Sequence, residues 1–268
     1  MSRILIAISA CALASSVTPL MAADWGTSAP GFRPAYPMDM APMEDSLDFE
    51  FGLRYFYGMG GQSFTNGSTY SATDLSHSLE VHGRIDDHST SSFLKGHIGY
   101  GAITDGEFSM DDTTNGSYST GRVGYVNADF GYLPINTGGV KAGAFIGYMY
   151  SDESPQNTGP ITHGLRLGVA ARAEFGDMFD ITAEGAIIPY SAVSGSMANP
   201  GGTLTGIEGS LYGAAGEVMA GAHLTDNFVI RAGARATYLN GHVQADQPGE
   251  HYIEMFRWGP LVELTATF

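Results

Sequence analysis

The chain has 268 residues, with 28 acidic and 12 basic side chains and a formal net charge of −16. This balance excludes a general nucleic-acid binder, which needs a basic face, so nucleic acid is not an expected partner. The 37 glycines, 14 tyrosines and 14 phenylalanines favour short strands and tight turns over a helical bundle. Beyond the N-terminus, no apolar run reaches the roughly 20 residues that a membrane helix requires.

The first 23 residues have the pattern of a secretory signal peptide. Arg3 supplies a positive charge, 4–13 form a short apolar segment, and small residues follow at Ala22 and Ala23. Residues 24–46 contain four prolines, which disfavour helix and central strand. We therefore predict that 24–46 form an extended, proline-rich periplasmic lead-in.

From residue 47 onward the sequence alternates between apolar and polar side chains. In 47–57 the odd positions are all apolar or aromatic, whereas the even positions include Asp48, Glu50 and Arg54. A period of two over this length indicates a strand with one face in an apolar medium. Ten such segments are predicted, at 47–57, 74–86, 91–101, 121–133, 140–150, 162–175, 179–190, 210–224, 227–239 and 254–268.

The connections between these segments alternate in length. Long polar stretches follow the odd-numbered segments, and short turns follow the even-numbered ones. Such segregation has no reason in a soluble β-sandwich, but it is typical of an outer-membrane barrel. The prediction for 47–268 is therefore an all-β, transmembrane antiparallel barrel of about ten strands, with short periplasmic turns and long extracellular loops. Outer-membrane lipids are its expected surroundings.

The last five residues, 264–268, alternate and end on Phe268. A terminal aromatic residue resembles the signal that the outer-membrane assembly machinery reads in bacterial barrels. The resemblance implies a Gram-negative envelope, the assembly machinery as a partner, and Phe268 as an assembly signal.

Charged strand residues fall on the polar face, which must be the lumen because a lipid-facing arginine at mid-bilayer costs roughly 2–4 kcal/mol. Side chains can fill so narrow a barrel, whereas a diffusion pore needs about 16 strands. Glu50 and Glu80 lie near Arg54 and Arg84 on adjacent strands, within pairing distance. We predict a charge network that plugs the lumen, comprising Glu50, Arg54, Glu80, Arg84, Arg166, Arg172, Glu174, Glu184, Glu217, Arg231, Arg235, Arg257 and Glu263, with Lys95, Asp129 and Lys141 on the same face.

Ten strands with five long loops and four short turns resemble the plan of the omptin family of outer-membrane proteases, and 48–57 and 224–234 are similar to omptin-like barrels of alphaproteobacteria. The resemblance implies an Asp pair in the second long loop and an Asp–His pair in the fourth, which together activate water. The second loop offers Asp105, Asp111 and Asp112, but the fourth, 191–209, has one acid, Glu208, and no histidine. We therefore predict an omptin-like fold without the protease.

No cofactor or metal site is predicted. His77, His82, His88 and His97 lie close in sequence, but a zinc site needs three or four ligands at fixed geometry, and hydrogen bonding in the lumen is the preferred interpretation. The sequence thus predicts a non-enzymatic, integral outer-membrane protein with a structural or surface-interaction role, whose loops could bind an extracellular ligand. An omptin-type endopeptidase is the first alternative and a narrow channel the second.

Overall fold

The computed structural model describes residues 46–268 apart from 112, 156–157, 177, 199–203 and 247–248. The predicted signal peptide and nearly all of the predicted lead-in lie outside this range. Among the described residues, no helix is long and apolar enough to cross a membrane.

The described residues form eleven strands. They are β1 (Leu47–Asn66), β2 (Ser68–Asp87), β3 (Ser92–Met110), β4 (Thr113–Tyr118), β5 (Gly121–Thr137), β6 (Val140–Pro155), β7 (Pro160–Phe175), β8 (Phe179–Ala198), β9 (Leu204–Thr225), β10 (Phe228–Ala245) and β11 (His251–Thr267).

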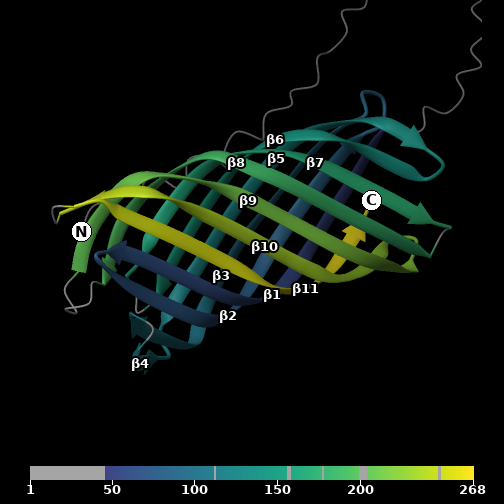
Figure 1. The fold of residues 1–268 in the computed structure, drawn as a ribbon. Helices are drawn as coiled ribbons and strands as arrows, with labels where there is room; N and C mark the ends of the chain where they lie inside the picture. The colour runs from purple at the N-terminus through teal and green to yellow at the C-terminus, as the bar shows by residue number, and fades with distance from the viewer. Residues whose placement is uncertain (1–45, 112, 156–157, 177, 199–203, 247–248) are drawn as a thin grey trace, which may run out of the picture. The chain divides into compact units, whose positions relative to one another are not determined.

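Ten of these strands close into an antiparallel barrel (Figure 1). The ten barrel strands pair in chain order, with β3 pairing with β5 past the short strand β4, and β1 pairs with β11 to close the ring. At the closure, Phe49 and Phe268 exchange two backbone hydrogen bonds of 3.2 and 2.9 Å. The short strand β4 adds to the far end of β3, where Gly106 faces Tyr118. The predicted ten-stranded antiparallel barrel is confirmed.

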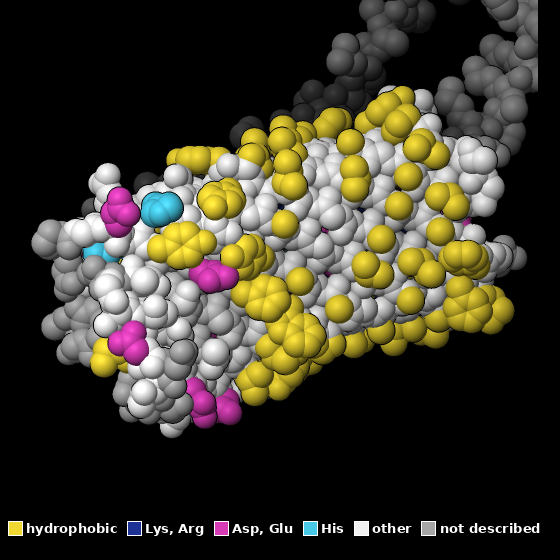
Figure 2. Space-filling view, in the orientation of Figure 1, with side chains coloured by type: hydrophobic (Ala, Val, Ile, Leu, Met, Phe, Trp, Pro, Cys, Tyr) yellow, Lys and Arg dark blue, Asp and Glu magenta, His cyan; other side chains and the backbone are white. Residues whose placement is uncertain are grey.

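Figure 2 shows an apolar belt on one face of the barrel, at the end where the C-terminus lies (Figure 1), and exposed apolar side chains on all ten barrel strands continue it around the ring. Its lipid-facing side chains include Leu53, Ile98, Ile146 and Val218, all exposed. Aromatic side chains lie at both edges of the belt, namely Phe49, Phe179 and Phe228 beside the short turns and Tyr100, Tyr148, Tyr190 and Trp258 farther up the strands. An apolar band between two aromatic girdles is the outer surface of a membrane-spanning barrel.

The strands continue well beyond the belt. The stretch 58–73, predicted as a long loop, instead forms a β1–β2 hairpin that turns at Gly67, whose φ of 75° favours glycine. The long extracellular connections are thus built largely from paired strand. Their outer faces are polar because they meet water rather than lipid, and that polarity resembles loop composition in the sequence.

Candidate functional site

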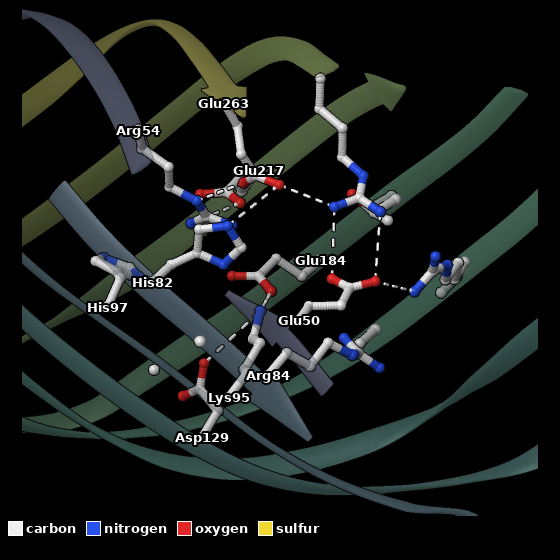
Figure 3. A pocket seen from close by; sticks show the side chains of 18 of the residues that line it. Glu50, Arg54, His82, Arg84, Lys95, His97, Asp129, Glu184, Glu217 and Glu263 are labelled. Atoms are coloured by element: carbon white, nitrogen blue, oxygen red, sulfur yellow. Dashed lines mark hydrogen bonds and ion pairs between the residues drawn. The ribbon is translucent and has the colours of Figure 1, made fainter. Parts of the chain in front are cut away.

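The lumen of the membrane-spanning half contains a network of ion pairs, part of which Figure 3 shows. Arg231 on β10 is its centre and is 4% exposed. Its guanidinium donates to Glu263 at 2.8 Å, to Asp180 at 3.0 Å and to Glu50 at 3.4 Å. Glu50 also accepts a hydrogen bond from Arg172 at 2.7 Å. Residues from β1, β7, β8, β10 and β11 therefore meet at one point inside the barrel.

The network continues from Glu263 toward the extracellular side. Arg54 donates to Glu263 at 2.5 Å and lies 3.5 Å from Glu217. Arg235 donates to Glu217 at 2.8 Å and makes a bidentate pair with Glu80 at 2.8 and 3.1 Å. Acids and arginines alternate along this chain, so each charge is compensated by a neighbour of opposite sign.

Two further clusters complete the charged part of the lumen. Arg166 donates to Asp129 at 3.0 Å and to Glu184 at 3.2 Å, and Lys95 contacts the same two acids.

Nearer the extracellular end, Arg257 donates to Asp74 at 2.8 and 3.0 Å and lies 3.1 Å from Glu153. Both Arg257 and Asp74 are buried.

In the β1–β2 hairpin, the charged residues that face each other in the register are not the ones that form ion pairs. The register places Glu50 opposite Arg84 and Arg54 opposite Glu80, as neighbours on adjacent strands. The arginines nevertheless choose other partners, since Arg84 pairs with Asp86 on its own strand at 2.5 Å and stacks on Phe93. Arg54 pairs with Glu263, its register partner on β11, so the β1–β2 register alone does not decide which charges pair.

Three buried acids of the network are absent from the predicted set, namely Asp74, Glu153 and Asp180. Their carboxylates pair with Arg257 and Arg231, which removes the excess of cations over anions on the predicted polar face. The alternation within each strand could have revealed Asp74 and Asp180, whereas Glu153 lies in a stretch that composition assigns to a loop.

The predicted residue Glu174 belongs to the rim rather than to the interior. Its side chain is 43% exposed and lies 3.5 Å from Arg172 at the periplasmic mouth.

The extracellular half of the barrel interior contains a large apolar cluster, beside buried polar side chains such as Gln62 and His251. Ile253 is 0% exposed and Ile207 is 1% exposed. The cluster, called the apolar plug below, consists of Phe64, Met149, Ile188, Val193, Met197, Ile207, Leu211, Leu239, Val243, Ile253 and Met255. Many of these positions lie in stretches predicted as loops, although a period of two is visible in them, as in Leu239–Val243 and Ile253–Met255.

Two cavities lie on the periplasmic side of the plug. A cavity of about 60 Å³ is lined by lumen charges that include Lys95 and Glu217, and one of about 300 Å³ lies at the periplasmic mouth. They share Glu50, Arg84 and Arg172 as lining residues, and no member of the apolar plug lines either one. Both cavities therefore lie between the apolar plug and the periplasm.

The acids of the second extracellular connection do not face a partner set of the omptin kind in the described residues. Asp111 follows the end of β3 and ties it to the start of β2, because its carboxylate accepts the Thr69 N–H at 2.8 Å and its own N–H donates to the Thr69 carbonyl at 2.9 Å. Asp105 and Glu107 are exposed. Asp112 lies outside the described residues.

Of the four histidines that are close in sequence, only His82 and His97 are neighbours in the structure, as register partners on β2 and β3. His82 and His97 lie in the lumen, hydrogen-bonded to Thr265 at 2.9 Å and to Asn127 at 3.1 Å.

His77 and His88 instead contact Tyr55 and Asp48 on β1, each at 2.5 Å. Within the described part of the chain, no group of three or more His, Cys, Asp or Glu side chains could hold a metal ion.

The fold is shared with a solved outer-membrane protein. The outer membrane protease OmpT from Escherichia coli matches with a TM-score of 0.60 and 12% identity, over 84% of this chain and 98% of that chain. The outer membrane protein OprG from Pseudomonas aeruginosa matches with a TM-score of 0.37 and 8% identity, over 83% and 95% of the two chains. No protein-family model and no curated protein sequence matches the chain.

The closed barrel and its apolar belt therefore define an integral outer-membrane β-barrel protein. Within that class, its ten-stranded fold is omptin-like.

Proposed function

We propose that the protein is a structural or surface-interaction barrel of the outer membrane, without catalysis and with a lumen closed to solutes. The observation that supports this most directly is the filling of the interior in two layers. Ion pairs and smaller apolar clusters occupy the membrane-spanning half, and the apolar plug with a few buried polar side chains occupies the extracellular half. A solute crossing the barrel would have to displace both layers.

The apolar plug is the stronger barrier to ions. An ion that enters it loses its water shell without gaining charged partners, which costs far more than thermal energy. Met255 and Ile253 lie just beyond Arg257 on β11, so the apolar layer begins directly above the charged one. The cavity at the periplasmic mouth is what favours a narrow channel as an alternative, but it lies below this barrier.

The omptin-like fold favours an endopeptidase as the other alternative. That chemistry would need an acid and a histidine on the fourth extracellular connection, between β8 and β9. The inward positions there include Val193, Met197 and Ile207, which belong to the apolar plug. Asp111 already accepts a backbone hydrogen bond from Thr69 at the start of β2.

The test combines single-channel recording in planar bilayers with a peptide-cleavage assay on the same refolded barrel. We expect no stepwise conductance and no cleavage of dibasic peptides. The matched variant is Asp111→Asn, which keeps an oxygen for the Thr69 N–H but removes the charge. Wild-type cleavage that disappears in Asp111→Asn would establish the endopeptidase, and regular wild-type conductance would establish the channel.

A further inference from the structure

A groove crosses the outer wall directly above the apolar belt. Its floor is Gly61 on β1, which faces Thr73 on β2 and Phe256 on β11. A side chain built on Gly61 would meet no atom within 4 Å, so the space above this residue is open. The groove has a volume of about 220 Å³.

The walls of the groove combine one aromatic ring with several oxygens. Phe256 is 41% exposed. One step farther from the membrane, Ser63 lies between Ser71 on β2 and Glu254 on β11. Hydroxyl groups can both donate and accept, whereas a carboxylate only accepts. The lining residues include no lysine or arginine.

The carboxylate of Glu254 is held in place by its neighbour. The Tyr238 hydroxyl donates to one of its oxygens at 2.7 Å, across the β10–β11 pair. Tyr238 itself faces Phe256 in the register, and Trp258 lies on the same outer face of β11 one step nearer the belt. The groove therefore adjoins exposed aromatic side chains at the level where the outer-leaflet headgroups begin.

We propose that this groove binds one hexose ring, neutral or amino-substituted, of a saccharide at the cell surface. A hexose has an apolar C–H face for Phe256 and a rim of hydroxyls for Ser63, Ser71, Thr73 and Glu254. A phosphorylated or acidic sugar is disfavoured, because the groove has a carboxylate and no cation. The inference rests on the surface-interaction role proposed above and names the chemistry of its partner.

Binding is measured by saturation-transfer NMR on the refolded barrel in a phosphocholine detergent. Alkyl glycosides are avoided, since their headgroups carry the ligand chemistry. The probes are methyl glucoside and methyl glucosaminide for the barrel in detergent, and a glucosyl lipid in vesicles for the barrel reconstituted in lipid without detergent. Binding of the free glycosides indicates a soluble or polymeric saccharide, whereas binding only to the glycolipid vesicles indicates a membrane source.

The decisive variant is Gly61→Val, which fills the floor and should weaken binding at least tenfold. Its matched control is Gly185→Val on β8, which also projects into open space but lies on another part of the wall. Glu254→Gln should weaken methyl glucosaminide several-fold and methyl glucoside little.

Equal binding by wild type and Gly61→Val, or no binding of any probe by wild type, would overturn the proposal. A conductance recording on the same protein preparation distinguishes failure of the sugar-binding groove from failure of the closed lumen. A closed barrel that binds no sugar disproves the groove alone, whereas a conducting barrel disproves the closed lumen whether or not sugar binds.

Discussion

Removal of the Arg235 charge tests whether the lumen is a dry ion-pair network. Arg235 makes a bidentate pair with Glu80, and it also donates to Glu217. Glu80 is 0% exposed, whereas Glu217 retains a contact with Arg54 at 3.5 Å. In Arg235→Met, Glu80 therefore loses its ion-pair partner in a buried position while Glu217 keeps one.

The expected loss is large because the stranded charge is buried. Two unit charges about 4 Å apart attract by about 4 kcal/mol at an effective dielectric constant of 20. Breaking a buried pair on one side typically costs about 3–5 kcal/mol. We expect Arg235→Met and Glu80→Gln each to lower the free energy of unfolding by an amount in this range. The double variant should lose less than the sum, by about 1–3 kcal/mol, because no orphan charge remains.

The assay is urea unfolding of the refolded barrel in lipid vesicles, followed by tryptophan fluorescence. Arg122→Met is the matched control, because the Arg122 side chain is 43% exposed and pairs with Asp152 on the outer surface. An exposed pair contributes at most about 1 kcal/mol. If Arg235→Met costs no more than Arg122→Met, or if the two lumen losses are strictly additive, water fills the lumen and the closed-barrel argument fails.

Three other outcomes are expected. Phe268→Ser should leave export to the periplasm intact but reduce membrane insertion, measured by the fraction that keeps heat-modifiable gel mobility; normal insertion at low expression would contradict the assembly role. Ile253→Ala should lower the free energy of unfolding by about 2–5 kcal/mol, because Ile253 is fully buried in the apolar plug, and an unchanged urea midpoint would show that the plug is loosely packed. In the β2–β3 turn, a hydrogen bond from the Ser89 hydroxyl lowers the pKa of Asp87 below its ordinary value of 3.8. The stabilisation of the turn by this hydrogen bond is present above pH 3.8 and is lost as pH falls through the lowered pKa. The Ser89 amide donates to the same carboxylate, so its protection relative to the intrinsic exchange rate at each pH should fall in acid in wild type but not in Asp87→Asn.

The membrane-spanning half of the barrel could be predicted from the sequence because its outer face must be apolar. In β1 the odd residues from Leu47 to Tyr55 face lipid, and Glu50 and Arg54 face the lumen, as the alternation indicates. The choice of ion-pair partners could not be predicted. Arg54 bonds to Glu263, its register partner on β11, rather than to Glu80, its register partner on β2, and the alternation of side chains does not distinguish between these two neighbours.

The strands of the extracellular half could not be predicted from an apolar outer face, because there the apolar side chains face inward and the polar ones face outward. Outside the membrane the outer wall meets water, so the hydrophobic effect places apolar side chains inside. Strand β11 shows the reversal within a few residues. Val262 and Leu264 face lipid while Glu263 is buried in the lumen, whereas farther up Ile253 and Met255 are buried and Glu254 lies on the outer face.

The charged layer of the lumen and the apolar plug meet on β11. Arg257 is the last inward charge before Met255 and Ile253, and its pairs with Asp74 and Glu153 lie directly against the apolar plug. An ion pair is strong where water is excluded and weak where water enters. The plug excludes external water from the extracellular side of the charge network, so the stability of the ion pairs depends on the packing of the plug. A cavity in the plug should therefore weaken the charges beneath it as well as the packing around it.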